Sequence, residues 1–199
     1  MIKLHNVCFS YGEVQVLKDL NYTFPDSGIF AIMGASGVGK STLLRVLCGL
    51  EKPTAGTVES THRKVAFAFQ EPRLLPWLNC EENINFVLND KKQDFDIAQT
   101  LLRDLALEAY AKSLPNALSG GMKQRLSLAR ALAVGADLLL LDEPFSALDN
   151  SLKERVAPLI QAANPSGLTL VVTHDRRDAA LLGATVLELT SSSLHIAQE

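Results

Sequence analysis

The sequence predicts an α/β fold with a mainly parallel sheet, and three observations predict it. The run 138–141 consists of four leucines, and Leu168–Val172 is nearly as apolar, as is typical of strands buried on both faces. A glycine-rich loop at 34–42 joins an apolar strand to a helix. With 199 residues, 47% of them hydrophobic, the chain can bury a sizeable core, so we expect a single domain over residues 1–199.

The first third of the chain predicts an antiparallel β subdomain followed by the first parallel strand. Strands are expected at 2–9 and 16–24 around a turn at 11–13. A strand at Gly28–Met33 leads into the glycine loop, and Gly49 ends the following helix at 40–48. Pro53 and Gly56 predict a turn before a further strand at 65–69.

The middle of the chain predicts an inserted helical subdomain at about residues 80–134. Between 80 and 107 the apolar residues recur at helical spacing, as at Ile97, Leu101, Leu102 and Leu105. A second helix follows residue 119, and its apolar face would carry Met122, Leu126, Ala129 and Ala133.

A further helix is expected between the two buried strands. Ser151 and Glu154 have the spacing of a capping box at its start, and the turn residues 164–167 end it. Pro158 lies inside this helix and predicts a kink, because proline lacks the backbone N–H group that a helix interior requires.

The composition argues against several classes of function. The chain has 19 basic and 22 acidic residues and a net charge of -3, so we expect no nucleic-acid partner. Cys8, Cys48 and Cys80 are odd in number and far apart, which argues against a disulfide framework and a structural zinc site. No apolar run approaches the roughly 18 to 20 residues that a membrane span needs, and residues 1–6 do not begin a signal peptide. We therefore expect a soluble protein, which can still dock on a membrane protein.

Residues 34–41 match the phosphate-loop pattern GxxxxGK[ST] between a strand and a helix. Its glycines let backbone N–H groups face phosphate oxygens, Lys40 supplies positive charge, and the Ser41 hydroxyl can bind Mg²⁺. A chance match is the alternative, but it is expected in only roughly a few tenths of a per cent of chains this long. The nucleotide-binding residues predicted here are Gly34, Ala35, Ser36, Gly37, Val38, Gly39, Lys40, Ser41 and Thr42.

An acidic pair ends the strand of leucines. Asp142 lies at the carboxyl end of that strand, where Mg²⁺ would sit in an open α/β sheet. Glu143 is then the candidate for the carboxylate that orients or deprotonates the attacking water. The alternative is an acidic pair that caps the next segment, and the phosphate loop favours the catalytic interpretation.

Residues 118–125, LSGGMKQR, predict a second anion-binding surface at the start of a helix. Ser119 offers a hydroxyl at the N-cap, while Gly120 and Gly121 leave backbone N–H groups uncovered. Together with the phosphate loop and the acidic pair, this stretch resembles the ATP-binding subunits of ABC transporters, and the resemblance runs from Tyr11 to His174. The segment 70–78, QEPRLLPWL, is most similar to nitrate, sulfonate and taurine importers.

The resemblance implies ATP and Mg²⁺ as ligands and assigns further residues. Tyr11 would stack on adenine, His174 would touch the γ phosphate, and Gln70 would contact Mg²⁺ or the attacking water, so that Ser41, Gln70 and Asp142 would hold the metal. Gln70 and His174 each follow a predicted strand, which places both at the edge of the sheet. From the residues alone, a structural histidine and a plain hairpin aromatic remain the alternatives.

The resemblance also implies an assembly. Two copies would pack head to tail, and residues 119–121 of one would close on the γ phosphate held by the other. Integral membrane permease subunits and an extracytoplasmic solute-binding protein would complete an importer, with this chain peripheral on the cytoplasmic side of the cell membrane. Leu74, Leu75 and Trp77 fit a permease contact and the protein core equally well. Alternatives in function are an ABC-type ATPase with a soluble, non-transport role and a small-molecule kinase.

Overall fold

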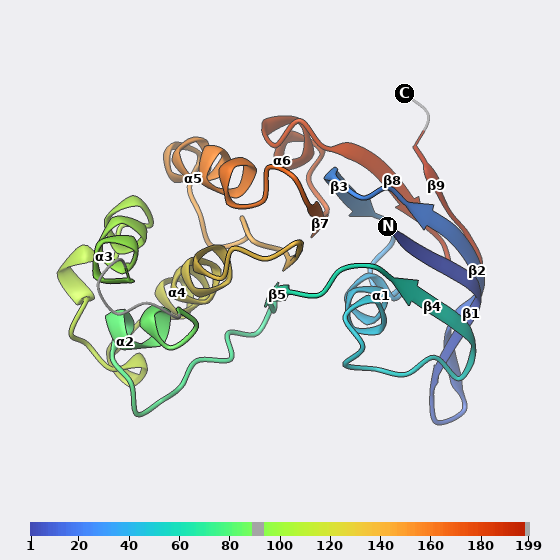
Figure 1. Ribbon diagram of the computed structural model, residues 1–199, viewed down its shortest axis with the longest axis horizontal. Helices are drawn as coiled ribbons and strands as arrows, with labels where there is room; N and C mark the ends of the chain where they lie inside the picture. The colour runs from blue at the N-terminus through green and yellow to red at the C-terminus, as the bar shows by residue number, and fades with distance from the viewer. Residues whose placement is uncertain (89–93, 198–199) are drawn as a thin grey trace.

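The computed structural model describes residues 1–88 and 94–197, and within these ranges the larger sheet is six-stranded (Figure 1). Its strand order is β5-β6-β7-β3-β8-β9. All neighbouring pairs are parallel except β8 and β9, which are antiparallel. The prediction of a mainly parallel sheet is therefore confirmed. Its strands are β3 (Gly28–Met33), β5 (Val65–Ala68), β6 (Leu138–Asp142), β7 (Leu168–Val172), β8 (Thr185–Leu189) and β9 (Leu194–Ile196).

The second sheet is antiparallel and is formed by β1 (Ile2–Tyr11), β2 (Val14–Phe24) and β4 (Ala55–Ser60) in the order β2-β1-β4. The antiparallel start of the chain was predicted, but β4 was not, because its residues are polar and mostly exposed. Gly56 lies inside β4 and not in a turn. It has φ +79°, and a side chain there would collide with the backbone carbonyls of His5 and Asn6.

The core explains why the strand of leucines is apolar throughout. Leu138 and Leu140 face a cluster shared with α1 (Lys40–Leu47) and the antiparallel sheet, so α1 lies between the two sheets (Figure 1). Leu139 and Leu141 point to the opposite face and pack under the helices. Since successive side chains of a strand alternate in direction, burial on both faces requires every residue to be apolar.

The helices on that opposite face include α2 (Cys80–Asn85), α3 (Asp94–Asp104) and α4 (Gly120–Ala133), with short 3-10 turns at Glu108–Tyr110 and Pro115–Ala117. The helical run expected at 80–107 is present as α2 and α3, and its residues 89–93 lie outside the described part. Ser119 caps α4 as predicted, since its hydroxyl accepts a hydrogen bond from the Met122 N–H group at 3.3 Å. The division into a subdomain at about 80–134 stays a prediction.

The last helices are α5 (Asn150–Ala163) and α6 (Arg176–Leu181). The capping box predicted at Ser151 is wrong, because Asp149 is the N-cap and its carboxylate accepts from the Leu152 N–H group at 2.9 Å. The helix therefore begins two residues earlier than predicted, and the aspartate oxygen satisfies an unpaired amide of its first turn. The helix continues through Pro158 as one element. Among the described residues, no helix combines the length and the apolar character that crossing a membrane requires.

Candidate functional site

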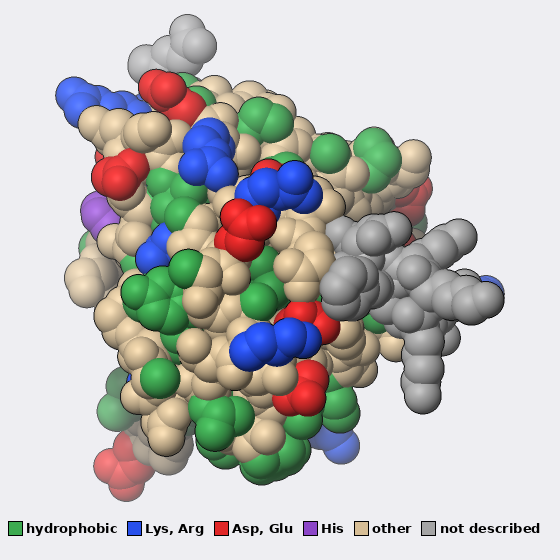
Figure 2. All heavy atoms as spheres, turned by 90° about the vertical axis from the view of Figure 1, so that its left-hand side faces the viewer, with side chains coloured by type: hydrophobic (Ala, Val, Ile, Leu, Met, Phe, Trp, Pro, Cys, Tyr) green, Lys and Arg blue, Asp and Glu red, His purple; other side chains and the backbone are tan. Residues whose placement is uncertain are grey.

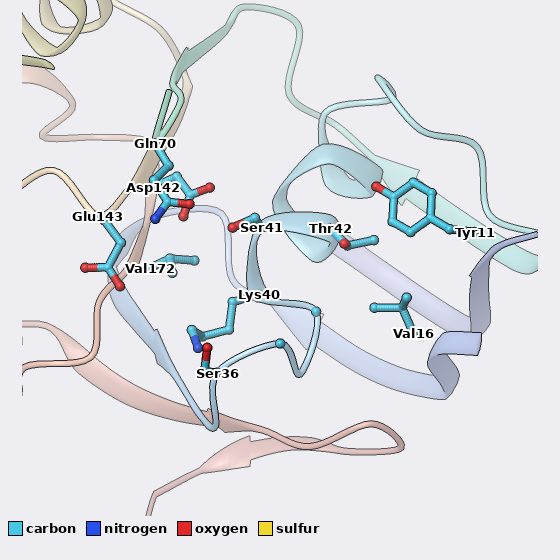
Figure 3. A pocket seen from close by; sticks show the side chains of 12 residues that line it. Tyr11, Val16, Ser36, Lys40, Ser41, Thr42, Gln70, Asp142, Glu143 and Val172 are labelled. Atoms are coloured by element: carbon cyan, nitrogen blue, oxygen red, sulfur yellow. The ribbon is translucent and has the colours of Figure 1, made fainter. Parts of the chain in front are cut away.

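A cavity of about 360 Å³ opens where the parallel strands end (Figure 3). The phosphate loop follows β3, and Gln70 follows β5. Asp142 is the last residue of β6, Glu143 comes directly after it, and Val172 is the last residue of β7. Ligands of open α/β sheets bind at this edge. The structure thus brings most of the predicted residues together, and the cavity is lined by Tyr11, Val16, Ser36, Gly37, Gly39, Lys40, Ser41, Thr42, Gln70, Asp142, Glu143 and Val172.

The phosphate loop has the geometry of an anion cradle. Gly39 has φ +104°, and a Cβ atom there would lie 2.7 Å from the Val16 side chain, so only glycine fits. Gly39 also caps α1 without a side-chain hydrogen bond, which leaves the amides of the first turn available to an anion. The Lys40 ammonium lies across the loop and donates to the Gly34 and Ala35 carbonyls, each at 2.9 Å.

Asp142 fits the role of a metal ligand. Its side chain is buried, with 4% of its surface exposed, and its Oδ1 atom has no hydrogen-bond partner. Burial raises the pKa of this carboxyl, while the Ser41 hydroxyl and the charges of Arg45 and Lys40 oppose the rise. A bound Mg²⁺ ion would partner the orphaned oxygen, and Ser41 and Gln70 supply further oxygen atoms of the kind this ion prefers.

Glu143 and His174 lie in direct contact. The Nδ1 atom of His174 is 3.0 and 3.1 Å from the two Glu143 carboxylate oxygens. The hydrogen bond to Glu143, and then its charge, raise the pKa of His174. Glu143 has φ +55°, an unusual value for a non-glycine residue, and its N–H group donates to the Val172 carbonyl at 3.0 Å. The fold therefore accepts backbone strain to place this carboxylate in the cavity.

Tyr11 lies at the rim of the cavity with an exposed ring (Figure 3). Its ring packs edge-on against Phe9 at 4.8 Å between centroids, and its hydroxyl accepts a hydrogen bond from Arg45 at 3.4 Å. These contacts hold a flat aromatic surface beside the phosphate loop. A purine base can stack on such a surface with little selectivity for the base.

Residues 119–121 lie apart from the phosphate loop of the same chain. Ser119 and Gly120 are exposed at the start of α4, and Gly121 approaches Ala147, with an added Cβ atom 3.4 Å from the alanine side chain. None of the three lines the cavity. Residues 119–121 therefore lie outside the cavity of their own chain, and their binding of an anion stays a prediction.

Comparison with known proteins identifies the family. A sequence profile described as ABC transporter matches residues 17–146, about two thirds of the chain. The chain belongs to the ABC transporter family. The aliphatic sulfonates import ATP-binding protein SsuB 2 of Pseudomonas syringae pv. tomato is 44% identical over 88% of this chain and 76% of its own length. The corresponding SsuB of Corynebacterium glutamicum is 43% identical over 93% and 78%.

Solved structures agree with this ABC transporter assignment. The dimeric post-hydrolysis structure of the ATP-binding cassette MJ0796, bound to ADP and Pi, has a TM-score of 0.87 and 29% identity over 100% of both chains. A second dimeric structure of that cassette has the same TM-score and 30% identity. This ABC cassette accordingly binds ATP and hydrolyses it.

Some residues of the ABC site belong to no sequence motif and were not predicted from the sequence. Val16 and Val172 line the cavity, and Arg45 donates to the Tyr11 hydroxyl and opposes the rise in the pKa of Asp142. Valines in strands and an arginine in a helix are common in any fold, so their role depends on the three-dimensional arrangement alone.

Replacing Asp142 by asparagine is expected to stabilise the nucleotide-free protein by about 1 kcal/mol at neutral pH. Folding raises the pKa of Asp142, so at a pH above this raised pKa the buried charge lowers the free energy of unfolding. This cost disappears as the pH falls through the raised pKa, because the carboxyl group then becomes neutral. The asparagine variant should lose its advantage in acid. Urea denaturation from pH 3 to 8 measures this, with and without Mg²⁺, and stabilisation by MgATP should be lost in the variant. An unchanged response to MgATP would contradict metal binding by Asp142.

Proposed function

We propose that this protein is the ATP-hydrolysing subunit of an importer for sulfonates or related oxyanions. The observation that carries the proposal is that one chain holds a phosphate cavity and a signature tip, residues 119–121, that lies outside it. A second copy packed head to tail brings the tip of each chain to the cavity of the other. The relatives named for aliphatic sulfonates import support the solute class, and the dimeric cassettes support the pairing.

Within the cavity we assign roles to the residues of this chain. Backbone amides of the loop 34–42 and the Lys40 ammonium bind the phosphates, and Tyr11 stacks on the adenine. Ser41, Gln70 and Asp142 would hold Mg²⁺, which would supply positive charge beside the phosphate oxygens. Glu143 orients the attacking water and accepts its proton.

His174 contacts the Glu143 carboxylate but does not itself line the cavity, and we assign it the contact with the γ phosphate that the family resemblance implies. A protonated imidazole there supplies positive charge where negative charge develops. Its contact with Glu143 also keeps the pKa of the histidine high. The pair thus combines a base for water with a cation for phosphate.

Hydrolysis changes the stability of the dimer. While ATP is bound, the γ phosphate lies between the loop of one chain and residues 119–121 of the other, so it favours the closed pair. Loss of that phosphate removes the interaction and favours opening. Such a difference in affinity between two states is what a nucleotide needs in order to drive a conformational cycle.

The segment that follows Gln70 is our candidate for the permease contact. Trp77 is 70% exposed and so is accessible to a partner, whereas Leu74 is partly buried against the core. Exposed tryptophan side chains often anchor protein interfaces. On the face that carries α2 and α3, the described acidic and basic side chains are interspersed with hydrophobic ones (Figure 2). A mixed surface of this kind suits a protein partner.

Asn83 fixes the segment that displays Trp77. Its side chain is fully buried, accepts from the Leu75 N–H group at 2.9 Å, and donates to the carbonyls of Leu75, Leu78 and Asn79 at 2.8 to 3.1 Å. The amide oxygen and both amide hydrogens thus find partners, with one hydrogen shared between two carbonyls, and these bonds hold the loop in one conformation. The exposed indole is therefore presented from a rigid support.

Replacing Trp77 by alanine is expected to leave the ATPase activity of the isolated chain unchanged and to weaken permease binding by about 2 kcal/mol, or roughly 30-fold. The indole lies outside the nucleotide cavity, so nucleotide chemistry has no reason to change. Titration of the permease complex in detergent measures the affinity. Phe86→Ala is the matched control, because Phe86 is 67% exposed at the other end of α2. Normal binding by the Trp77 variant would place the contact elsewhere.

Purification of the native complex tests the function as a whole. We expect the tagged chain to bring down integral membrane permease subunits, with a solute-binding protein on the opposite side of the membrane. In vesicles that contain this complex, uptake of labelled alkanesulfonate should require ATP on the side of the cassette. Recovery of nucleic acid without membrane protein would contradict the proposal and favour a soluble, non-transport ATPase.

A further inference from the structure

A partly buried ion pair lies next to the loop that carries His174. Lys153 of α5 and Asp178 of α6 are 2.7 Å apart between Nζ and Oδ1, with only 19% and 7% of their side chains exposed. Neither residue lines the nucleotide cavity. Buried charges of this kind add little stability compared with apolar residues of similar size, so their presence calls for another physical role.

The ion pair connects to the His174 loop through Thr173. The second oxygen of Asp178 accepts a hydrogen bond from the Thr173 hydroxyl at 3.2 Å. The same hydroxyl accepts from the Asp175 N–H group at 3.1 Å. The residues on both sides of His174 are therefore tied to Asp178, which is itself paired with Lys153.

His174 itself has little that holds it. Its side chain is 76% exposed, and Glu143 is the partner that the structure gives it. An exposed ring on a short loop takes its position from the backbone that carries it. Here the hydroxyl of Thr173, a residue that is 1% exposed, ties that backbone to Asp178 and to the Asp175 N–H group.

We infer that Lys153 and Asp178 are positioning residues that hold His174 against Glu143 through Thr173. This inference rests on the proposed part of His174 in ATP hydrolysis. It also links the site to the start of α5. Lys153 lies one helical turn after Asp149, the N-cap, and its amide donates to the Asp149 carbonyl at 2.9 Å. A shift of α5 therefore reaches the His174 loop through Lys153 and Asp178.

The test is steady-state ATPase kinetics of the purified chain. Lys153→Met is expected to lower kcat about tenfold with KM for ATP within about twofold, because the lost contact acts on His174 and not on nucleotide binding. Lys153→Arg, which keeps the charge, should retain kcat within about threefold. In the His174→Ala background, Lys153→Met should change kcat by less than about twofold, because a residue that acts only through His174 has nothing left to position.

Lys112→Met is the matched control for stability. Lys112 is paired with the buried Glu81 carboxylate at 3.0 Å. This variant also removes the lysine partner of a buried carboxylate, but neither residue lines the cavity. It is expected to lower the melting temperature and to leave kcat unchanged. Should Lys153→Met fail to fold, Thr173→Val removes the same link without altering charge, and Thr173→Ser should restore it.

Two different failures can be told apart. An equal loss of kcat from Lys153→Met with and without His174 would overturn the positioning role while leaving the proposed function intact. Full activity of His174→Ala alone would overturn both the role of His174 and the inference built on it. A loss of kcat from Lys153→Met that occurs only in chains that retain His174 supports the positioning role of Lys153 and Asp178.

Discussion

The Glu143→Gln variant is expected to bind MgATP with nearly normal affinity and to hydrolyse it about 10² to 10⁴ times more slowly. Glutamine has the same shape, so it tolerates the unusual φ of +55° as well as glutamate does and still fills its place in the cavity. It cannot accept a proton from the attacking water. Release of phosphate measures hydrolysis, and fluorescence titration with an ATP analogue measures binding.

The same variant is expected to accumulate as a dimer when ATP is present. If the γ phosphate holds two chains together, a chain that cannot remove it stays closed, and gel filtration should detect a species of twice the mass. Glu154→Gln is the matched control, since Glu154 is an exposed residue of α5 outside the cavity. Full hydrolysis by the Glu143 variant would remove this residue from its assigned role.

Titration of His174 tests the contact between Glu143 and His174 independently of ATP hydrolysis. The hydrogen bond to Glu143 is the largest cause of the raised pKa of His174, so this pKa should fall towards its ordinary value in Glu143→Gln. In the wild type, the ion pair stabilises the fold below the ordinary histidine pKa, and this contribution is lost as the pH rises through the raised pKa. NMR titration of the imidazole in both proteins measures the difference. An identical pKa would mean that the contact is absent in solution.

The residues that the sequence predicted best are those that lie close together along the chain. The phosphate loop, the strand of leucines and the acidic pair each combine local sequence with a physical requirement, such as φ +104° at Gly39. The family resemblance added Gln70 and Tyr11, and the structure places both on the cavity. A contiguous motif needs no knowledge of the fold, which explains this success.

Features that depend on distant residues could not be predicted. The contact of Glu143 with His174 joins positions 31 residues apart, and the Lys153 to Asp178 pair joins positions 25 residues apart. The strands β8 and β9 and the helix α6 are short and only partly apolar, so they owe their structure to neighbours in the sheet. The start of α5 was misplaced by two residues because Ser151 and Asp149 both suit an N-cap, and packing decides between them.

A mixture of two inactive variants, Lys40→Ala and Gly120→Asp, is expected to recover roughly a quarter of wild-type activity. At equal amounts about half of the dimers are mixed, and each has one site with the intact loop of one chain and the intact tip of the other. A Cβ atom at Gly120 meets nothing within 4 Å, so the Gly120 variant should fold normally and its defect should arise at the partner. Its added carboxylate would repel a phosphate held by the second copy.

The control for this mixture is Lys40→Ala with Glu143→Gln, which should stay inactive. Lys40 and Glu143 line the same cavity of one chain, so no mixed dimer contains a complete site. If residues 119–121 served their own chain instead, both mixtures would remain inactive, because every chain would carry a defective site. Activity in the first mixture but not in the second would show that two chains share each site. This test needs neither the permease nor the transported solute.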